Sequence, residues 1–452
     1  MRNYCYSVFF LAFGVAQLAG CIRAGSGAGS LTFSADGEQV CYLREDRIEE
    51  DVVDGKTWLR SISLHWCNTS APTSERSVHI ESLGWEYRGY GTVVTDVAWS
   101  PKGSRIGVLT PHRVVVVAAE TAETLEIRDG RISSFAWLAE GEVAYATRRT
   151  RGDRQQRVIC RQDLQTHKKT DVVALPERLA GGSPCQKEQW APSGRFAVLT
   201  EPEYGGQCHC VDVSNGTVRA FGQTNAYQVG VAWSPDSSRV FSVSGKIGAN
   251  DVHEALLFEP LTGRIVDCTN AFRKAFPDRF PRLERLWAAD GEYMLVNTLD
   301  TGGSLVRAEP WKVVRLGLLL APRLSKTGPS RMIPHLFRLP VPGWVGVRRT
   351  GPYDDGHTFY AADYSGQHVL PLPSGDVSPD GTLAARLERG KVKIHPLGIW
   401  WVPSSVSPLP GGRGNGDREG LPTERGYEWD KWLNDLEREK GDITDFCDGG
   451  NG

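Results

Sequence analysis

Hydrophobic and polar residues follow one short pattern that recurs along most of this chain. A large apolar residue is followed by a spacer, Ala or Pro, any residue, and then Gly or Ser. After nearly every copy comes an apolar run of strand length, such as Ile106-Gly107-Val108-Leu109. The seven copies occupy residues 33–37, 99–103, 137–141, 190–194, 233–237, 287–291 and 377–381. The pattern predicts a strand, a tight turn and a second strand, repeated about every 40 to 55 residues.

The residues of the pattern suit a turn. Pro fixes φ at the first corner, and Gly tolerates positive φ at the exit. The preceding aromatic residue is expected to point into a core between neighbouring sheets. A second turn follows in most units, at residues 214–216, 261–263 and 364–366. Each unit is therefore predicted to hold four strands, with tight turns joining the first to the second and the third to the fourth.

With a Phe/Trp-Ser-Pro-Asp-Gly turn of this kind, the chain resembles the TolB-type and WD-repeat-like β-propellers over roughly residues 30–403. The resemblance implies an all-β fold of four-stranded antiparallel blades. The spacing between Trp287 and Val377 is about double the usual repeat, and runs such as Trp344-Val345-Gly346-Val347 supply a blade without the motif. This gives eight blades. Seven is the alternative if two C-terminal units share one blade.

The first residues have the parts of a secretory signal. Arg2 precedes a short apolar run at residues 8–16, which is too short to span a bilayer. Leu18-Ala19-Gly20-Cys21 then resembles the lipobox of bacterial lipoprotein precursors. The resemblance implies a signal peptide at 1–20, lipid attachment at Cys21 and a flexible tether at 21–29. An ordinary cleaved signal with an incidental Cys21 is the alternative.

The other end of the chain changes composition. Residues 404–426 are rich in Gly, Pro and Ser and indicate a linker. Within the final segment, 427–452, residues 427–440 read as a short amphipathic helix with Trp429 and Trp432 on one face. That face is expected to pack on the propeller, and docking of a partner is the alternative.

The composition of the chain limits the classes of partner that it is expected to bind. The formal net charge is −2, which argues against nucleic acid, since a nucleic-acid binder has a strong basic excess. An exported chain with an anchor at Cys21 would sit on the cell membrane or outer membrane and face the periplasm or the exterior. Its partner would then be a protein, a peptide or a cell-wall component. Of the ten cysteines, eight remain besides Cys5 and Cys21, and their pairing cannot be deduced from sequence.

Function is expected on the face where the second strand of a blade joins the third and the fourth joins the next blade. Connections on the opposite face are tight turns, whereas these are long and varied, and loops on a rigid scaffold collect binding residues. Residues 45–56 form a predicted acidic loop and residues 148–157 a predicted basic one. The candidate binding residues on this face are Trp85, Tyr87, Arg148, Arg149, Arg151, Tyr204, Tyr353, Asp354 and Asp355. Either charged loop taken alone also fits a merely solvated surface.

Catalytic motifs are sparse. The sequence holds neither Gly-x-Ser-x-Gly nor His-Glu-x-x-His. Cys208-His209-Cys210 would invite a metal, but on a strand the two cysteines and the histidine face opposite ways, so buried thiols or a disulfide are favoured. We therefore expect no metal and no cofactor, and a membrane-anchored binding or scaffold module. The alternative is a hydrolase or lyase acting on extracellular polymer from a site in the central channel.

Overall fold

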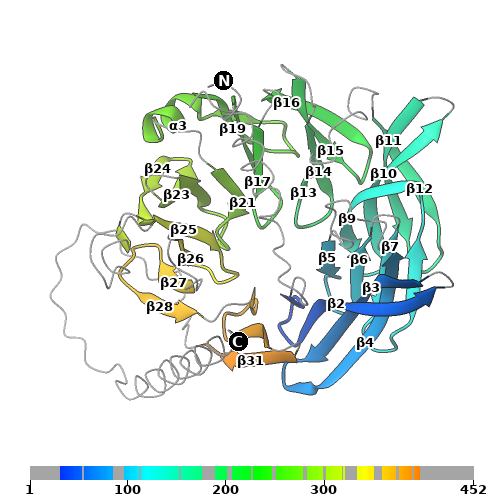
Figure 1. Ribbon diagram of the computed structural model, residues 1–452. Coiled ribbons are helices and arrows are strands. Elements are labelled where there is room, and N and C mark those ends of the chain that lie inside the picture. The colour runs from blue at the N-terminus through cyan, green and yellow to red at the C-terminus, as the bar shows by residue number, and fades with distance from the viewer. Residues whose placement is uncertain are drawn as a thin grey trace, which may run out of the picture. The chain divides into compact units, whose positions relative to one another are not determined.

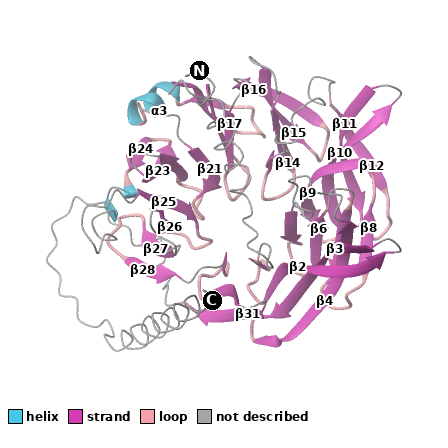
Figure 2. Cartoon of the chain, viewed as in Figure 1, coloured by secondary structure: helices cyan, strands magenta, loops and turns pink. Residues whose placement is uncertain are grey.

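The computed structural model describes residues 31–52, 55–84, 96–110, 113–151, 154–175, 189–200, 206–224, 228–246, 251–277, 282–298, 302–317, 319–320, 333–350, 359–372, 376–388 and 391–397. All of them belong to the compact unit that ends at Val402. The predicted signal peptide, tether, linker and C-terminal helix lie outside these residues. Strands dominate the described part, as Figure 2 shows.

Eight blades follow one another in chain order; six of them are separate sheets, and blades 5 and 6 are the two halves of one eight-stranded sheet. Blades 1 to 4 are formed by β1 (Thr32–Phe33), β2 (Gln39–Val52), β3 (Gly55–Asn68), β4 (Ala71–Gly84); β5 (Asp96–Trp99), β6 (Arg105–Leu109), β7 (Val114–Ala118), β8 (Thr124–Ile127); β9 (Arg131–Ala139), β10 (Glu142–Arg151), β11 (Arg154–Asp163), β12 (Lys169–Ala174); and β13 (Gln189–Trp190), β14 (Phe196–Thr200), β15 (Gly206–Asp212), β16 (Thr217–Thr224). Blades 5 to 8 are formed by β17 (Gln228–Trp233), β18 (Val240–Lys246), β19 (Asp251–Phe258), β20 (Ile265–Asp267); β21 (Arg282–Trp287), β22 (Met294–Thr298), β23 (Gly302–Ala308), β24 (Trp311–Val314); β25 (Ile333–Arg338), β26 (Trp344–Thr350), β27 (Phe359–Asp363), β28 (Val369–Leu372); and β29 (Asp376–Val377), β30 (Leu383–Glu388), β31 (Lys391–Pro396).

The predicted all-β propeller with eight blades is confirmed (Figure 1). Within every blade the strands pair antiparallel in sequence order. Blades 5 and 6 are additionally linked by one parallel pair, Trp233 with Leu286. Blade 8 has three strands in the described residues. The helix α3 (Thr269–Ala275) connects blade 5 to blade 6 and buries Phe272 and Phe276 in the core that these two blades share.

The recurring motif forms the turn between the first two strands of most blades. In blade 1, Gly37 has φ of 75° and donates its backbone N–H to the carbonyl of Ser34. The Ser34 hydroxyl donates to Asp36 Oδ1 at 2.5 Å. Blades 5 and 8 repeat this serine–aspartate bond. Ser237 takes the glycine position of blade 5 with φ of 62°, so the turn tolerates the strain of a side chain there.

The aromatic residue of the motif joins each blade to the one before it. The indole N–H groups of Trp99, Trp137, Trp233 and Trp287 donate to backbone oxygens on or beside the first strand of the preceding blade, at 2.9–3.1 Å. Trp190 instead donates to the hydroxyl of Ser134 at 2.8 Å. The ring also fills the core between the blades, as predicted. One residue type thus supplies both packing and a directional bond at each of these junctions.

The third copy of the motif departs from the predicted turn. Ala139 pairs directly with Glu142, which leaves Glu140 and Gly141 as a two-residue hairpin turn. Glu140 accepts hydrogen bonds from the Ser100 hydroxyl at 2.6 Å and the Lys102 backbone N–H at 2.8 Å. Blade 2 has Lys102 where blade 1 has Asp36. A carboxylate from blade 3 therefore takes the place of the aspartate that the turn of blade 2 lacks.

Blade 7, which has lost the motif, is joined to blade 6 by a different device. The buried side chain of Asn297 on β22 donates to the carbonyl of Leu336 and accepts from its N–H, both at 2.8 Å. This pair of bonds fixes β25 onto blade 6 without a tryptophan.

The last blade meets the first through side chains. Phe33, Val40 and Tyr42 of blade 1 share a core with Ala385 and Val392 of blade 8. The described strands of the two blades belong to separate sheets. Packing therefore closes the ring at this junction.

Candidate functional site

The two charged loops predicted from the sequence are ends of long hairpins, so their assignment as loops was wrong. Strands β2 and β3 stay paired out to Val52 and Gly55, and β10 and β11 out to Arg151 and Arg154. In blade 2 the corresponding hairpin ends at the pair Leu109 and Val114. The charged residues continue the strands because strand pairing is made by backbone hydrogen bonds, which do not depend on the polarity of the side chains. The dipeptides at 54–55 and 152–153, Asp-Gly and Gly-Asp, were the turn signals in the sequence.

Only part of the predicted binding face can be placed. Arg148, Arg149 and Arg151 lie on β10, and only the first two have described side chains. The other candidates lie outside the described residues, as does the predicted lipid attachment at Cys21: Trp85, Tyr87, Tyr204, Tyr353, Asp354 and Asp355.

The structure separates Arg148 from Arg149, because neighbouring residues on a strand point to opposite faces of the sheet. Arg149 contacts Cys160, which belongs to the core shared with blade 2. Arg148 follows Ala146 on the other face, where the core is shared with blade 4. The two arginines therefore serve different junctions.

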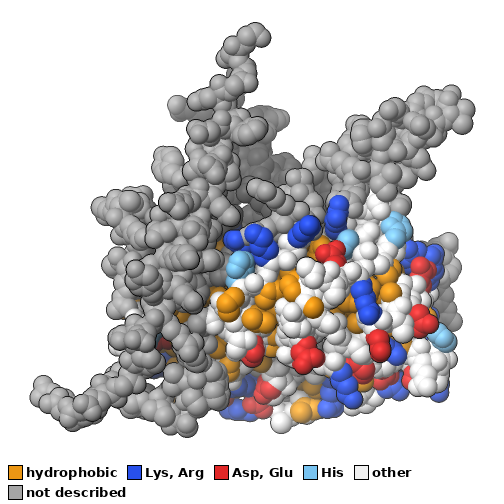
Figure 3. Space-filling view, turned by 90° about the horizontal axis from the view of Figure 1, so that it is seen from below, with side chains coloured by type: hydrophobic (Ala, Val, Ile, Leu, Met, Phe, Trp, Pro, Cys, Tyr) orange, Lys and Arg blue, Asp and Glu red, His pale blue; other side chains and the backbone are white. Residues whose placement is uncertain are grey.

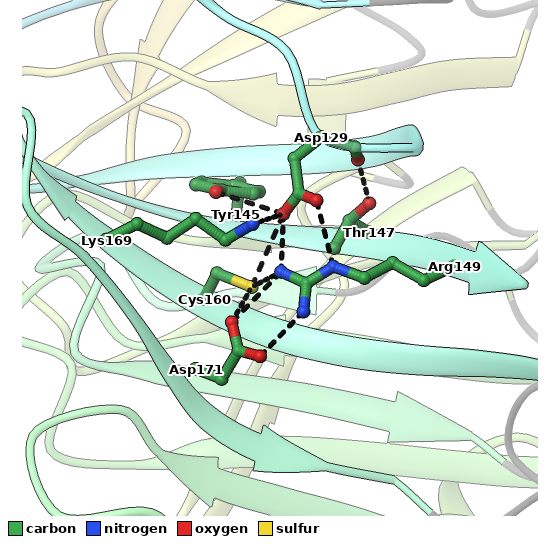
Figure 4. A network of polar contacts seen from close by, with 7 residues as sticks. All are labelled: Asp129, Tyr145, Thr147, Arg149, Cys160, Lys169 and Asp171. Atoms are coloured by element: carbon green, nitrogen blue, oxygen red, sulfur yellow. Dashed lines mark hydrogen bonds and ion pairs between the residues drawn. The ribbon is translucent and has the colours of Figure 1, made fainter. Parts of the chain in front are cut away.

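Arg149 is the centre of a polar network between blades 2 and 3 (Figure 4). Its guanidinium binds Asp129 through Nε at 2.8 Å and Nη2 at 2.6 Å. It also binds Asp171 on β12, with Nη1 to Oδ2 at 2.6 Å. Lys169 Nζ lies 2.9 Å from Asp129 Oδ2, and the Tyr145 hydroxyl donates to the same oxygen at 3.1 Å. Two cations and two carboxylates thus neutralise each other and hold the connection between the blades.

The electrostatics of the network follow from these bonds. Burial alone would raise the pKa of Asp129, but hydrogen bonds from Arg149 and Lys169 lower it overall. Hydrogen bonds to Asp129 and then Asp171 raise the pKa of Arg149. Burial raises the pKa of the Cys160 thiol to about 12, so this cysteine stays protonated and unreactive at neutral pH. The network stabilises structure, and Arg149 is committed to it.

The face of the blade 3 sheet that is turned toward blade 4 carries a row of arginines. The row crosses the sheet near the tip of the hairpin. Arg148 pairs in register with Arg131 on β9 and with Arg157 on β11. Arg131 is exposed, Arg148 is half-buried and Arg157 is only 2% exposed. Sequence reasoning found Arg148 and Arg157 as part of a basic segment but missed Arg131, because only the strand register brings it alongside.

Charges on the outer surface are also unevenly spread. In the view of Figure 3, Lys and Arg side chains lie along the upper border of the described surface, Lys, Arg, Asp and Glu side chains are mixed along the lower border, and hydrophobic side chains lie between them.

A groove of about 480 Å³ lies between blades 1 and 2, on the face of the propeller that carries the tight turns. Turn residues of both blades line it, among them Asn68, Lys102, Gly103 and Glu120. One of its cations, Arg76, donates to the backbone carbonyls of Ala119 and Glu120. That guanidinium therefore helps to join the two blades.

The cysteine motif gives buried thiols, one of the two outcomes favoured from the sequence. Cys208 and Cys210 on β15 are both buried and reduced. Burial raises the pKa of Cys210 to about 12. Within the described ranges, no three His, Cys, Asp or Glu residues lie close enough together to hold a metal ion. The described residues also contain no helix long and apolar enough to cross a membrane.

Comparison with known proteins gives a likeness in fold. No family model matches the sequence, and no curated protein matches it. An oligogalacturonate lyase in complex with manganese is similar at 11% identity and a TM-score of 0.46, over 77% of this chain and 91% of that one. The β-propeller domain of the trilobed protease from Pyrococcus furiosus is similar at 12% identity and 0.43, over 77% and 96%. TolB from Acinetobacter baumannii is similar at 12% identity and 0.32, over 75% and 82%. At these identities and scores the likenesses support no statement about activity.

Proposed function

We propose that this chain is a non-catalytic binding or scaffold protein of the bacterial cell envelope. A lipid at Cys21 would hold it to the cell membrane or outer membrane, facing the periplasm or the exterior. The propeller would engage a protein, peptide or cell-wall partner through the rim that carries the hairpins of blades 1 and 3.

The observation that carries this proposal is the pair of extended, oppositely charged hairpins. Residues 45–56 contain six acidic and two basic residues, and residues 148–157 contain five arginines and one aspartate. Strands β2 and β3 are 14 residues long and β10 and β11 are 10 residues long, whereas β6 and β7 of the blade between them have 5 each. Strands of 5 residues are enough for the core of blade 2, so we infer that part of the added length in blades 1 and 3 serves something outside the core. Opposite charges on one rim would orient a charged partner as it approaches.

Site-specific crosslinking in the native cell tests the rim. A photoreactive amino acid replaces exposed Thr150, next to the tip of the blade 3 hairpin, and in a control it replaces exposed Thr121, in a turn on the opposite face. We expect a discrete adduct from position 150 and none from position 121. Adducts from position 121 alone, or from neither position, would contradict the proposed binding face.

The anchor has its own test. Cys21→Ala is expected to move the protein to the soluble fraction and to end incorporation of labelled palmitate. Unchanged membrane association would show that another element holds the protein.

A further inference from the structure

The groove between blades 1 and 2 is walled by turns that hydrogen bonds hold in place. Trp66 and Ala119 line it from the core that the two blades share. The Trp66 indole N–H donates to the carbonyl of Ala119 at 2.9 Å. The Ala119 N–H donates to the carbonyl of Ser104 at 2.9 Å and so ties two turns of blade 2 together. The groove is therefore formed before any ligand arrives, and its volume of about 480 Å³ is typical of a small-molecule site.

The recurring turn motif gives this groove a cation that no other copy of the motif has. The fourth position of the motif is Lys102 in blade 2 and Asp, Glu or Ser in the other six copies. The Glu140 carboxylate accepts from the backbone N–H of Lys102 and from two serine hydroxyls of the turn. Within the described ranges no carboxylate pairs with the ammonium group of Lys102, whose side chain lines the groove. The exchange of aspartate for lysine thus takes an acceptor from the turn and adds a positive charge to the groove.

Arg76 on β4 supplies a second cation. Its Nη1 donates to the carbonyls of Ala119 and Glu120. In the part of the chain that the structure describes, its Nε and Nη2 have no hydrogen-bond partner, so N–H donors of this guanidinium remain for a ligand. Among the lining residues, Glu120 has the one carboxylate. Two cations against one carboxylate give the lining a net charge of +1.

We propose that this groove binds a short free acidic peptide of about two or three residues, the size that such a volume accommodates. A carboxylate of the peptide bonds to Arg76 and Lys102, since charge-assisted hydrogen bonds are the strong ones. The amino group of the peptide pairs with Glu120, and its amides meet the side-chain amides of Gln39 and Asn68, which also line the groove. A phosphate would leave Glu120 without a counterpart. The site lies on the face opposite the hairpin rim and does not depend on the proposed function.

Two exposed lysines on the tight-turn face give a matched pair of variants. Lys102→Met is compared with Lys168→Met, because Lys168 lies in the turn between β11 and β12, away from the groove. Isothermal titration and thermal unfolding of the whole protein use the dipeptide alanyl-glutamate at constant ionic strength. We expect the dipeptide to bind the unaltered protein and Lys168→Met equally and to raise the Tm of both. Lys102→Met should bind it about tenfold more weakly, as loss of one hydrogen bond to a charged group predicts.

Further comparisons assign the two ends of the ligand. Alanyl-glutamine lacks the side-chain carboxylate and should bind about tenfold more weakly than alanyl-glutamate. Glu120→Gln should weaken the binding of alanyl-glutamate but not of its N-acetyl form, which has no ammonium group to pair with Glu120. Arg76→Met should weaken binding and also lower the Tm of the free protein, because Arg76 joins blade 1 to blade 2.

Three results would overturn the site. The first is the absence of binding and of any rise in Tm with millimolar alanyl-glutamate and the unaltered protein. The second is equal binding by Lys102→Met and the unaltered protein. The third is binding of inorganic phosphate as tight as that of the dipeptide, which would leave no role for Glu120. None of these results bears on the crosslinking test of the hairpin rim, because a bound dipeptide adds too little mass to be taken for a protein adduct at position 121.

Discussion

At the scale of single residues, polar side chains at the blade junctions form hydrogen bonds that the repeated motif alone does not predict. The turn of blade 2 lacks an aspartate of its own, and Glu140 of blade 3 accepts its hydrogen bonds instead. Burial would raise the pKa of Glu140, but hydrogen bonds from Ser100, Ser104 and the backbone lower it. The charged form is therefore the one that fits the turn.

A double substitution tests this exchange of roles. Glu140→Gln should lower the free energy of unfolding by about 1.5–3 kcal/mol, the usual contribution of hydrogen bonds to charged groups. Lys102→Asp supplies an acceptor within the turn, as Asp36 does in blade 1. In that background Glu140→Gln should therefore cost little. Denaturant unfolding of the four proteins measures the coupling, and equal costs in both backgrounds would refute it.

At the scale of elements, the tryptophan motif and the Asn297 bonds are two solutions to the same problem of docking one sheet on the next. A tryptophan donates one bond and fills volume, whereas Asn297 satisfies both backbone groups of Leu336 and fills little. On β25, Phe337 has no polar side-chain atom, so it cannot donate the hydrogen bond that a motif tryptophan gives to the preceding blade. The docking of blade 7 on blade 6 should therefore depend on the side-chain amide of Asn297, whereas the docking of neighbouring blades depends on tryptophan packing.

Asn297→Leu preserves the approximate shape but leaves two buried backbone groups without partners, so we expect a loss of about 2–4 kcal/mol. Hydrogen exchange should accelerate first in β25 and β26, while β10 and β11 keep their protection. Asn68→Leu is the control, because Asn68 is exposed at the end of β3. Uniform acceleration in all blades would mean that the bonds stabilise the ring as a whole.

At the scale of the whole molecule, the periodic motif predicted the propeller and favoured eight blades over seven, including blade 7, where only the spacing and three apolar runs remained. It could not predict which residues share a face, because register between strands is set by pairing in the folded chain. Arg148 and Arg149 are adjacent in sequence and belong to opposite junctions, and Arg131 joins the row from another strand. The long hairpins were missed because runs of charged residues are typical of solvated loops, although their short turn signals were present. Six of the nine predicted face residues fall outside the described part of the chain.

The junction between blades 8 and 1 shows the same dependence on packing, with a titratable group inside it. Asp376, at the start of β29, interacts with the backbone of Phe33 in blade 1, and burial raises its pKa to about 6. The folded protein therefore holds the proton more tightly than the unfolded chain, whose aspartate titrates near 3.8. Stability from this group should fall as pH rises from about 4 to about 6 and stay low above that range.

Replacing Asp376 tests whether this junction limits the stability of the ring. Asp376→Asn keeps an acceptor for the backbone but cannot ionise, so above pH 6 it should unfold at higher temperature than the unaltered protein. The gain should be up to about 3 kcal/mol, since one pKa unit corresponds to about 1.4 kcal/mol, and it should vanish near pH 4. Asp380→Asn is the matched control of opposite sign. Burial would raise the pKa of Asp380, but bonds from Ser378 and Thr382 lower it, so its loss should destabilise at neutral pH and matter less in acid. Calorimetry of the three proteins between pH 4 and pH 8 separates the two effects, and a gain for Asp376→Asn that does not depend on pH would exclude its ionisation as the cause.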